Sequence, residues 1–113
     1  MIAHPTPPRT PGVFELSAED RKTLLQMFMR EACEDLQRLE GALLEGDVDE
    51  ATHRVHRLYG AALTVGATPL IAPLEDFEQF LRSARQIPPD NALRLMHLRQ
   101  ALHDYRQHAQ PMA

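Results

Sequence analysis

The sequence predicts an all-α protein, an antiparallel up-down four-helix bundle. Leucine and alanine supply 30 of its 113 residues, whereas valine and isoleucine supply seven. Leucine and alanine lose little rotamer freedom in a helix, and β-branched residues favour strands. Four segments carry apolar residues at steps of three and four, with helix-capping residues between them. Such helices bury their apolar stripes against one another, and short connections make neighbouring helices antiparallel.

The first helix is expected to begin after Ser17, a good N-cap that is followed by acidic residues at the positive end of the helix dipole. Its apolar stripe is Leu25, Phe28, Met29, Ala32, Leu36, Leu39 and Leu43. Cys33 lies near this stripe and is expected to be a small core or boundary residue. We expect Gly46 to end the helix in the left-handed conformation, and Asp47 with Glu50 to cap the next one as a capping box.

The second and third helices are predicted from two further stripes. The second stripe is Val48, Ala51, Val55, Leu58, Ala62 and Val65. Gly66 ends this helix, and Thr68 followed by Pro69 predicts the N-cap and first turn of the third. The third stripe is Leu70, Leu74, Phe77 and Leu81. Because Pro73 removes a backbone hydrogen bond one turn in, we expect an irregular first turn.

The fourth helix follows a break at residues 87–90, which read Ile-Pro-Pro-Asp and include a new cap. Its stripe is Leu95, Leu98, Leu102 and Tyr105, and it fades at Gln110. The first 12 residues contain four prolines and no apolar periodicity, a composition that favours extended chain. We therefore predict a flexible Pro-rich linker or tail over residues 1–12 and the bundle over residues 13–110.

Composition and charge exclude several classes of protein. The net charge is −4 and no basic block is present, which disfavours a nucleic-acid partner. No apolar run approaches the roughly 20 residues that span a bilayer, so this segment is not expected to contact a membrane. The single cysteine excludes an internal disulfide and favours a reducing compartment, so we expect a cytoplasmic location.

The second helix has an unusual polar face. His56 lies about 140° from the centre of the apolar stripe, Gly60 lies within about 40° of His56, and Leu63 within about 20°. Glycine inside a helix costs about 1 kcal/mol relative to alanine, but its missing side chain leaves room for another molecule. The strip formed by His53, His56, Gly60 and Leu63 is therefore either a docking patch or an ordinary polar face that tolerates a glycine.

Residues 56–60 read His-Arg-Leu-Tyr-Gly, and Gly66-Ala67 follow at the end of the same helix. This segment resembles the signature of histidine-containing phosphotransfer (Hpt) domains, which is His-x-Leu-Lys-Gly followed by Gly-Ala. Further along, Leu70, Leu74 and Phe77-Glu78 match the family's pattern by spacing. The resemblance covers roughly residues 14 to 108. It implies a four-helix bundle, in agreement with the stripes.

The resemblance also implies a phosphorelay intermediate in which His56 accepts and donates a phosphoryl group. The partner aspartates belong to response-regulator receiver domains, for example that of a hybrid sensor histidine kinase. Imidazole suits this role because it is largely neutral at cellular pH. The residues expected to bind the partner are Gly60, Tyr59, Arg57, Leu63 and His53. Such a domain is either a free cytoplasmic protein or the cytoplasmic C-terminal domain of a membrane-bound hybrid kinase.

No intrinsic cofactor is expected, because Mg²⁺ would be supplied at the receiver domain. The chain lacks a Gly-rich phosphate loop, so no ATP site is expected either. It resembles a phosphotransfer intermediate rather than a self-contained enzyme. His53 and His56 alone are fewer than the ligands of a zinc site, so we expect no metal. Glu75, Asp76 and Glu78 are expected to be a solvated acidic stretch.

Tyr59 departs from the family pattern, which commonly has lysine three residues after the histidine. A tyrosine hydroxyl donates a hydrogen bond but carries no charge. Arg57 lies about 100° around the helix from His56, so it would need a long reach. Either phosphotransfer proceeds with weaker support or another helix supplies the cation. The alternative function is a non-phosphorylated helical-bundle adaptor that binds a receiver or kinase partner.

Overall fold

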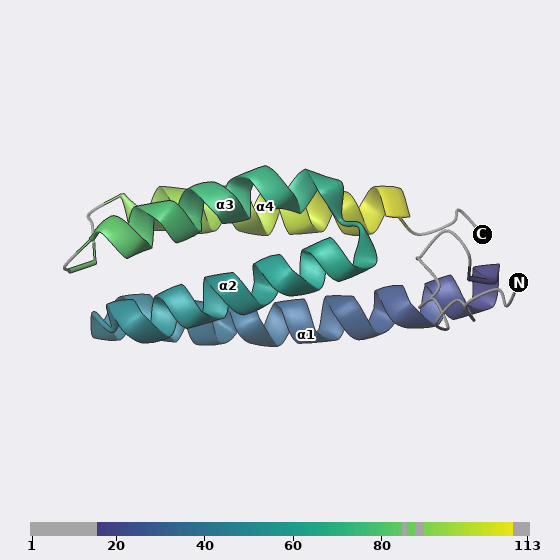
Figure 1. Cartoon of the computed structure of the whole chain (residues 1–113), viewed down its shortest axis with the longest axis horizontal. Helices are drawn as coiled ribbons and strands as arrows, with labels where there is room; N and C mark the ends of the chain where they lie inside the picture. The colour runs from purple at the N-terminus through teal and green to yellow at the C-terminus, as the bar shows by residue number, and fades with distance from the viewer. Residues whose placement is uncertain (1–15, 85, 88–89, 110–113) are drawn as a thin grey trace, which may run out of the picture.

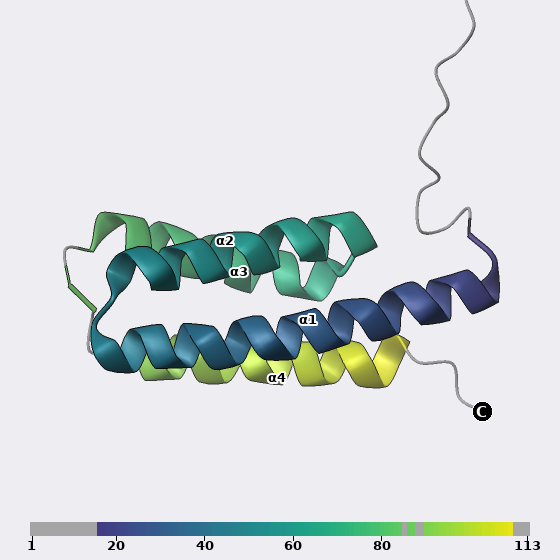
Figure 2. The ribbon, with the colours of Figure 1, turned by 90° about the horizontal axis from the view of Figure 1, so that it is seen from below.

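The computed structural model describes residues 16–84, 86–87 and 90–109, which form four helices without a strand. The helices are α1 (Ala18–Glu45), α2 (Val48–Val65), α3 (Thr68–Ser83) and α4 (Asn91–Ala109). Consecutive helices run antiparallel, and α4 returns to lie beside α1 (Figures 1 and 2). The predicted four-helix bundle is confirmed.

Two glycines make the short connections at the ends of α1 and α2. Gly46 has φ 75° and Gly66 has φ 73°, the left-handed conformation that glycine adopts without steric cost. At the start of α1, the Ser17 hydroxyl accepts a hydrogen bond from the Asp20 amide at 3.1 Å. These three predicted helix ends are confirmed.

The predicted capping box at the start of α2 forms only in part. Asp47 Oδ1 accepts from the Glu50 amide at 3.0 Å, as expected. The Glu50 carboxylate, however, accepts from Arg54 Nε at 2.6 Å instead of reaching back. The Asp47 amide is already bonded to the Ala42 carbonyl at 2.9 Å, so it has no donor left for Glu50.

The start of α3 differs from the prediction by one residue. Thr68 is the first residue of the helix, and Ala67 occupies the cap position without a side-chain hydrogen bond. The first turn is tight, because the Leu70 amide bonds to the Ala67 carbonyl only three residues back at 2.9 Å. Beyond that turn, the helix runs through Pro73 without a break.

The predicted stripes form the core. The buried residues among them are Phe28, Ala32, Leu36, Leu39, Leu43, Ala51, Val55, Leu58, Ala62, Val65, Leu70, Leu74, Phe77, Leu81, Leu95, Leu98 and Leu102. Leu25, Met29, Val48 and Tyr105 are half-buried. The expectation for Cys33 was wrong, because its side chain is exposed. Ala32, Asp35 and Leu36 define the buried face of α1 there, and position 33 lies beside that face.

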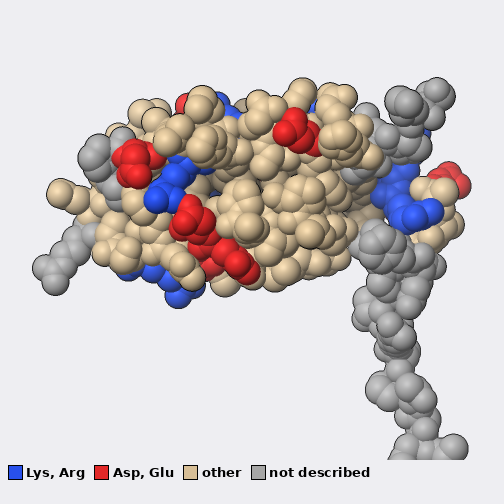
Figure 3. All heavy atoms as spheres, turned by 90° about the horizontal axis from the view of Figure 1, so that it is seen from above, with Lys and Arg blue, Asp and Glu red and all other residues tan. Residues whose placement is uncertain are grey.

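Arg94 links α4 to α3. Its guanidinium lies 3.6 Å from the centre of the Phe80 ring and forms an ion pair with Asp76. Figure 3 shows the face formed by α3 and α4, where acidic and basic side chains gather towards the connection between these two helices. The contacts of Arg94 therefore hold α4 against α3, and α3 in turn packs against α2.

Several expectations concern residues outside the described ranges. They include the linker over residues 1–12, the prolines at 88 and 89, and the fading of the last stripe at Gln110. The boundaries at residues 13 and 110 stay predictions. No helix in the described ranges has both the length and the apolar character to cross a membrane.

Candidate functional site

The polar face of α2 has the orientation that the sequence predicts. His53, His56, Gly60 and Leu63 are all exposed, with 61% of the His56 side chain accessible to solvent. A Cβ atom added at Gly60 would meet no atom of a neighbouring element within 4 Å. The strip is therefore accessible to a partner along α2, as the docking role requires.

His56 is hydrogen-bonded across to α3. Its Nδ1 lies 2.7 Å from Oε1 of Glu78, whose side chain is only 12% exposed. The same oxygen accepts from Arg82 Nη2 at 2.7 Å and from Arg82 Nε at 3.2 Å. The expectation of a solvated Glu78 was wrong, because α3 turns this carboxylate towards α2.

The charge of Glu78 determines which nitrogen of the His56 imidazole carries the proton. Burial alone would raise the pKa of Glu78, but the hydrogen bonds from Arg82 and His56 outweigh burial and hold that pKa below its ordinary value. An ionised carboxylate can only accept hydrogen bonds. Nδ1 of neutral His56 therefore carries the proton, and Nε2 keeps its lone pair, as a nucleophile requires.

Tyr59 is also tied to α3. Its hydroxyl donates a hydrogen bond to Glu75 Oε1 at 2.8 Å, and this bond is the main reason why the pKa of Tyr59 is raised above its ordinary value. Tyr59 therefore stays protonated, and its one donor is in use. The acidic stretch of α3 thus holds both Tyr59 and His56, through Glu75 and Glu78 respectively.

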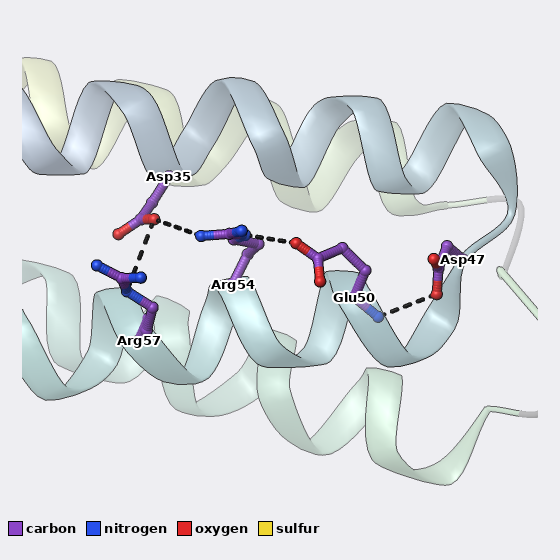
Figure 4. A network of polar contacts seen from close by, with 5 residues as sticks. All are labelled: Asp35, Asp47, Glu50, Arg54 and Arg57. Carbon is purple, nitrogen blue, oxygen red and sulfur yellow. Dashed lines mark hydrogen bonds and ion pairs between the residues drawn. The ribbon is translucent and has the colours of Figure 1, made fainter.

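Arg57 points towards α1 and away from this arrangement. Its Nε lies 4.0 Å from Oδ1 of Asp35, which is only 6% exposed (Figure 4). Arg54 Nη1 lies 3.4 Å from the same oxygen, and Arg54 Nε bonds to Glu50 (Figure 4). These ion pairs connect α1 to α2, so Arg57 does not supply the charge missing at Tyr59.

A groove of about 430 Å³ opens beside His56, between the first half of α2 and the end of α3. Three basic side chains line it, namely His53, His56 and Arg82. Its remaining lining residues are Val48, Asp49, Thr52, Leu81 and Ala84. Among the residues with described positions, no group of three or more His, Cys, Asp or Glu residues is arranged to hold a metal ion.

Sequence reasoning missed Glu78 and Arg82 as members of the site. A signal for Glu78 was present, because Phe77-Glu78 already matched the Hpt pattern by spacing. Arg82 follows Glu78 by four residues on the same helix, the spacing at which an acid and a base pair. Both could be placed beside His56 only once the register between α2 and α3 was known.

Fold and site together define a small helical bundle that presents one oriented, solvent-exposed imidazole. The model of the Hpt domain family matches residues 23–108, and the chain belongs to this family. Hpt domains carry phosphoryl groups on histidine in phosphorelays and interact with receiver domains of two-component systems. No curated protein and no solved structure matches the chain significantly.

Proposed function

We propose that the chain is a phosphorelay intermediate that accepts and donates a phosphoryl group on His56. The observation that carries this proposal is the hydrogen bond between His56 Nδ1 and Glu78, on a side chain that is mostly exposed. It orients the ring and leaves Nε2 as the nucleophile. The proposed partners are aspartates of receiver domains, in the cytoplasm, either of separate response regulators or of a hybrid kinase.

In the forward step, His56 Nε2 attacks the phosphorus of the partner's aspartyl phosphate. The bond between phosphorus and the aspartate oxygen breaks, the N–P bond forms, and the aspartate leaves as a carboxylate. Nδ1 keeps its proton, so the ring becomes positive while it faces ionised Glu78. This carboxylate stabilises the positive ring, and the reverse step returns the phosphoryl group to an aspartate. We propose that the receiver binds the Mg²⁺ that neutralises the phosphoryl oxygens.

The proposal is tested by incubating the full chain with a phosphorylated receiver and Mg²⁺. We expect one phosphoryl group per chain, labile in acid and stable in base, as is typical of phosphohistidine. Phosphorus and nitrogen NMR should place it on Nε2, because Glu78 holds the proton on Nδ1. If no receiver from the same organism labels the chain, the adaptor function replaces this one. The neutral Tyr59, bonded to Glu75, is the observation that favours that second candidate.

We expect Gly60→Gln to slow phosphotransfer from a receiver without unfolding the bundle. The new side chain meets no neighbouring element, and glutamine is a better helix former by up to about 1 kcal/mol. It would nevertheless project from the face that carries His56 and obstruct a partner. The measurement is the transfer rate together with the midpoint of thermal unfolding. An unchanged rate would show that Gly60 does not keep the approach open.

A further inference from the structure

We propose that Arg82 supplies the positive charge for the phosphoryl group on His56, in place of the lysine that the Hpt pattern carries at the position of Tyr59. The inference rests on the proposed function of His56. It moves the cation from α2, where the motif has it, to α3.

Arg82 and His56 share one acceptor atom. His56 Nδ1 and Arg82 Nη2 each lie 2.7 Å from Glu78 Oε1. Both side chains line the same groove between α2 and α3. The carboxylate between them therefore keeps the guanidinium near the imidazole, although 62% of the Arg82 side chain is exposed.

The other strong bases of α2 and α3 are engaged elsewhere. The structure describes every residue of α2 and α3. Besides Arg82, these two helices contain two arginines, Arg54 and Arg57, and no lysine. Arg54 bonds to Glu50 and Asp35, and Arg57 lies against Asp35, on the side facing α1. Tyr59 donates its hydroxyl to Glu75. Arg82 is thus the permanent cation of this helix pair that faces the groove.

The chemistry of a guanidinium fits an exchange between two anions. Arginine has five N–H donors, and its contacts with Glu78 involve Nε and Nη2. A phosphoryl group adds negative charge and three strong acceptor oxygens. Because arginine binds phosphate through paired hydrogen bonds, the exposed guanidinium swings to the phosphoryl oxygens. Glu78 then keeps its hydrogen bond to His56 Nδ1 and continues to orient the ring.

The test uses phosphoramidate as the phosphodonor, which removes receiver docking from the measurement. Nε2 attacks phosphorus, the P–N bond of phosphoramidate breaks, and its protonated amino group leaves as ammonia while the N–P bond to His56 forms. We expect Arg82→Met to lower the labelling rate on the order of tenfold, the effect of losing one charge-assisted contact. Arg82→Lys should keep most of the rate.

The matched control is Arg99→Met, because Arg99 is also an exposed arginine paired with a glutamate, Glu40, but lies on α4. It should label at the parent's rate. A second measurement follows the phosphorus NMR shift of the phosphohistidine against pH. Loss of a neighbouring cation raises the pKa of the phosphoryl group, so the Arg82→Met titration should move to higher pH, whereas that of Arg99→Met should not.

Restoring the motif lysine gives a further test. We expect Tyr59→Lys to return labelling towards the parent's rate in the Arg82→Met background, because either position brings a cation to the same imidazole. Arg82→Met with the parent's rate and phosphorus titration would overturn the inference about Arg82, and so would a double variant as slow as Arg82→Met. A folded parent chain that phosphoramidate leaves unlabelled at His56 would instead overturn the proposed function.

Discussion

His56→Gln should abolish phosphorylation of the chain by a phosphorylated receiver and leave the helical circular dichroism signal unchanged. Glutamine offers no ring nitrogen to attack phosphorus, so the loss is complete and not merely a slower rate. The fold should survive because the His56 side chain is mostly exposed, and a glutamine amide can also reach Glu78, to which His56 is hydrogen-bonded.

The control for this variant is His53→Gln. His53 lines the same groove and is exposed on the same helix, but it lies one turn before the His56-to-Gly60 segment. Most of the labelling should therefore remain. Full labelling of His56→Gln would contradict the assignment and move the acceptor to His53.

Leu58→Ala should lower the free energy of unfolding by roughly 2–5 kcal/mol, the range for removing a buried leucine side chain. Leu58 is 2% exposed and lies in the core on the side of α2 opposite to His56. Urea or thermal unfolding followed by circular dichroism measures the change. A variant that unfolds like the parent would show that the inward face of α2 is assigned wrongly.

Leu63→Ala provides the comparison on the same helix. Leu63 is 53% exposed, and surface substitutions usually change stability by less than about 0.5 kcal/mol. The same chemical change should therefore cost several times less at position 63 than at position 58. The pair separates burial from any general effect of replacing a leucine in α2.

The helices could be predicted because each one depends on local signals. The steps of three and four place residues such as Val55, Leu58 and Ala62 on one side of α2, and all three are buried. Gly46 and Gly66 end their helices because the left-handed conformation is costly for other residues. Neither inference needs knowledge of the neighbouring helix.

The polar contacts between helices were harder to predict from the sequence. Asp35 lies on the apolar side of α1, and nothing in its own segment shows that Arg54 and Arg57 of α2 meet it. Glu78 looks like one more surface acid until α3 is placed against α2. Such contacts depend on the rotation and register of two helices, which a one-dimensional pattern leaves open.

Cys33 is an error of a different kind, because it concerns one side chain within one helix. It follows buried Ala32 and precedes buried Asp35, but a step of about 100° per residue carries it off the packed face. Helical geometry, by contrast, correctly placed His56, Gly60 and Leu63 on one exposed strip, because all three belong to one helix. Apart from Cys33, prediction was accurate within helices and weaker between them.

The length of α1 has a consequence for how the domain opens. With 28 residues it is the longest of the four helices, Phe28 is its first buried residue, and its N-terminal end extends beyond its neighbours in Figure 2. The ten residues before Phe28 span about 15 Å at 1.5 Å per residue, and an isolated helix so short is marginal in water. Within these turns Leu24 packs against the core but is only half-buried, so we expect them to open at a lower free energy than the turns that follow Phe28.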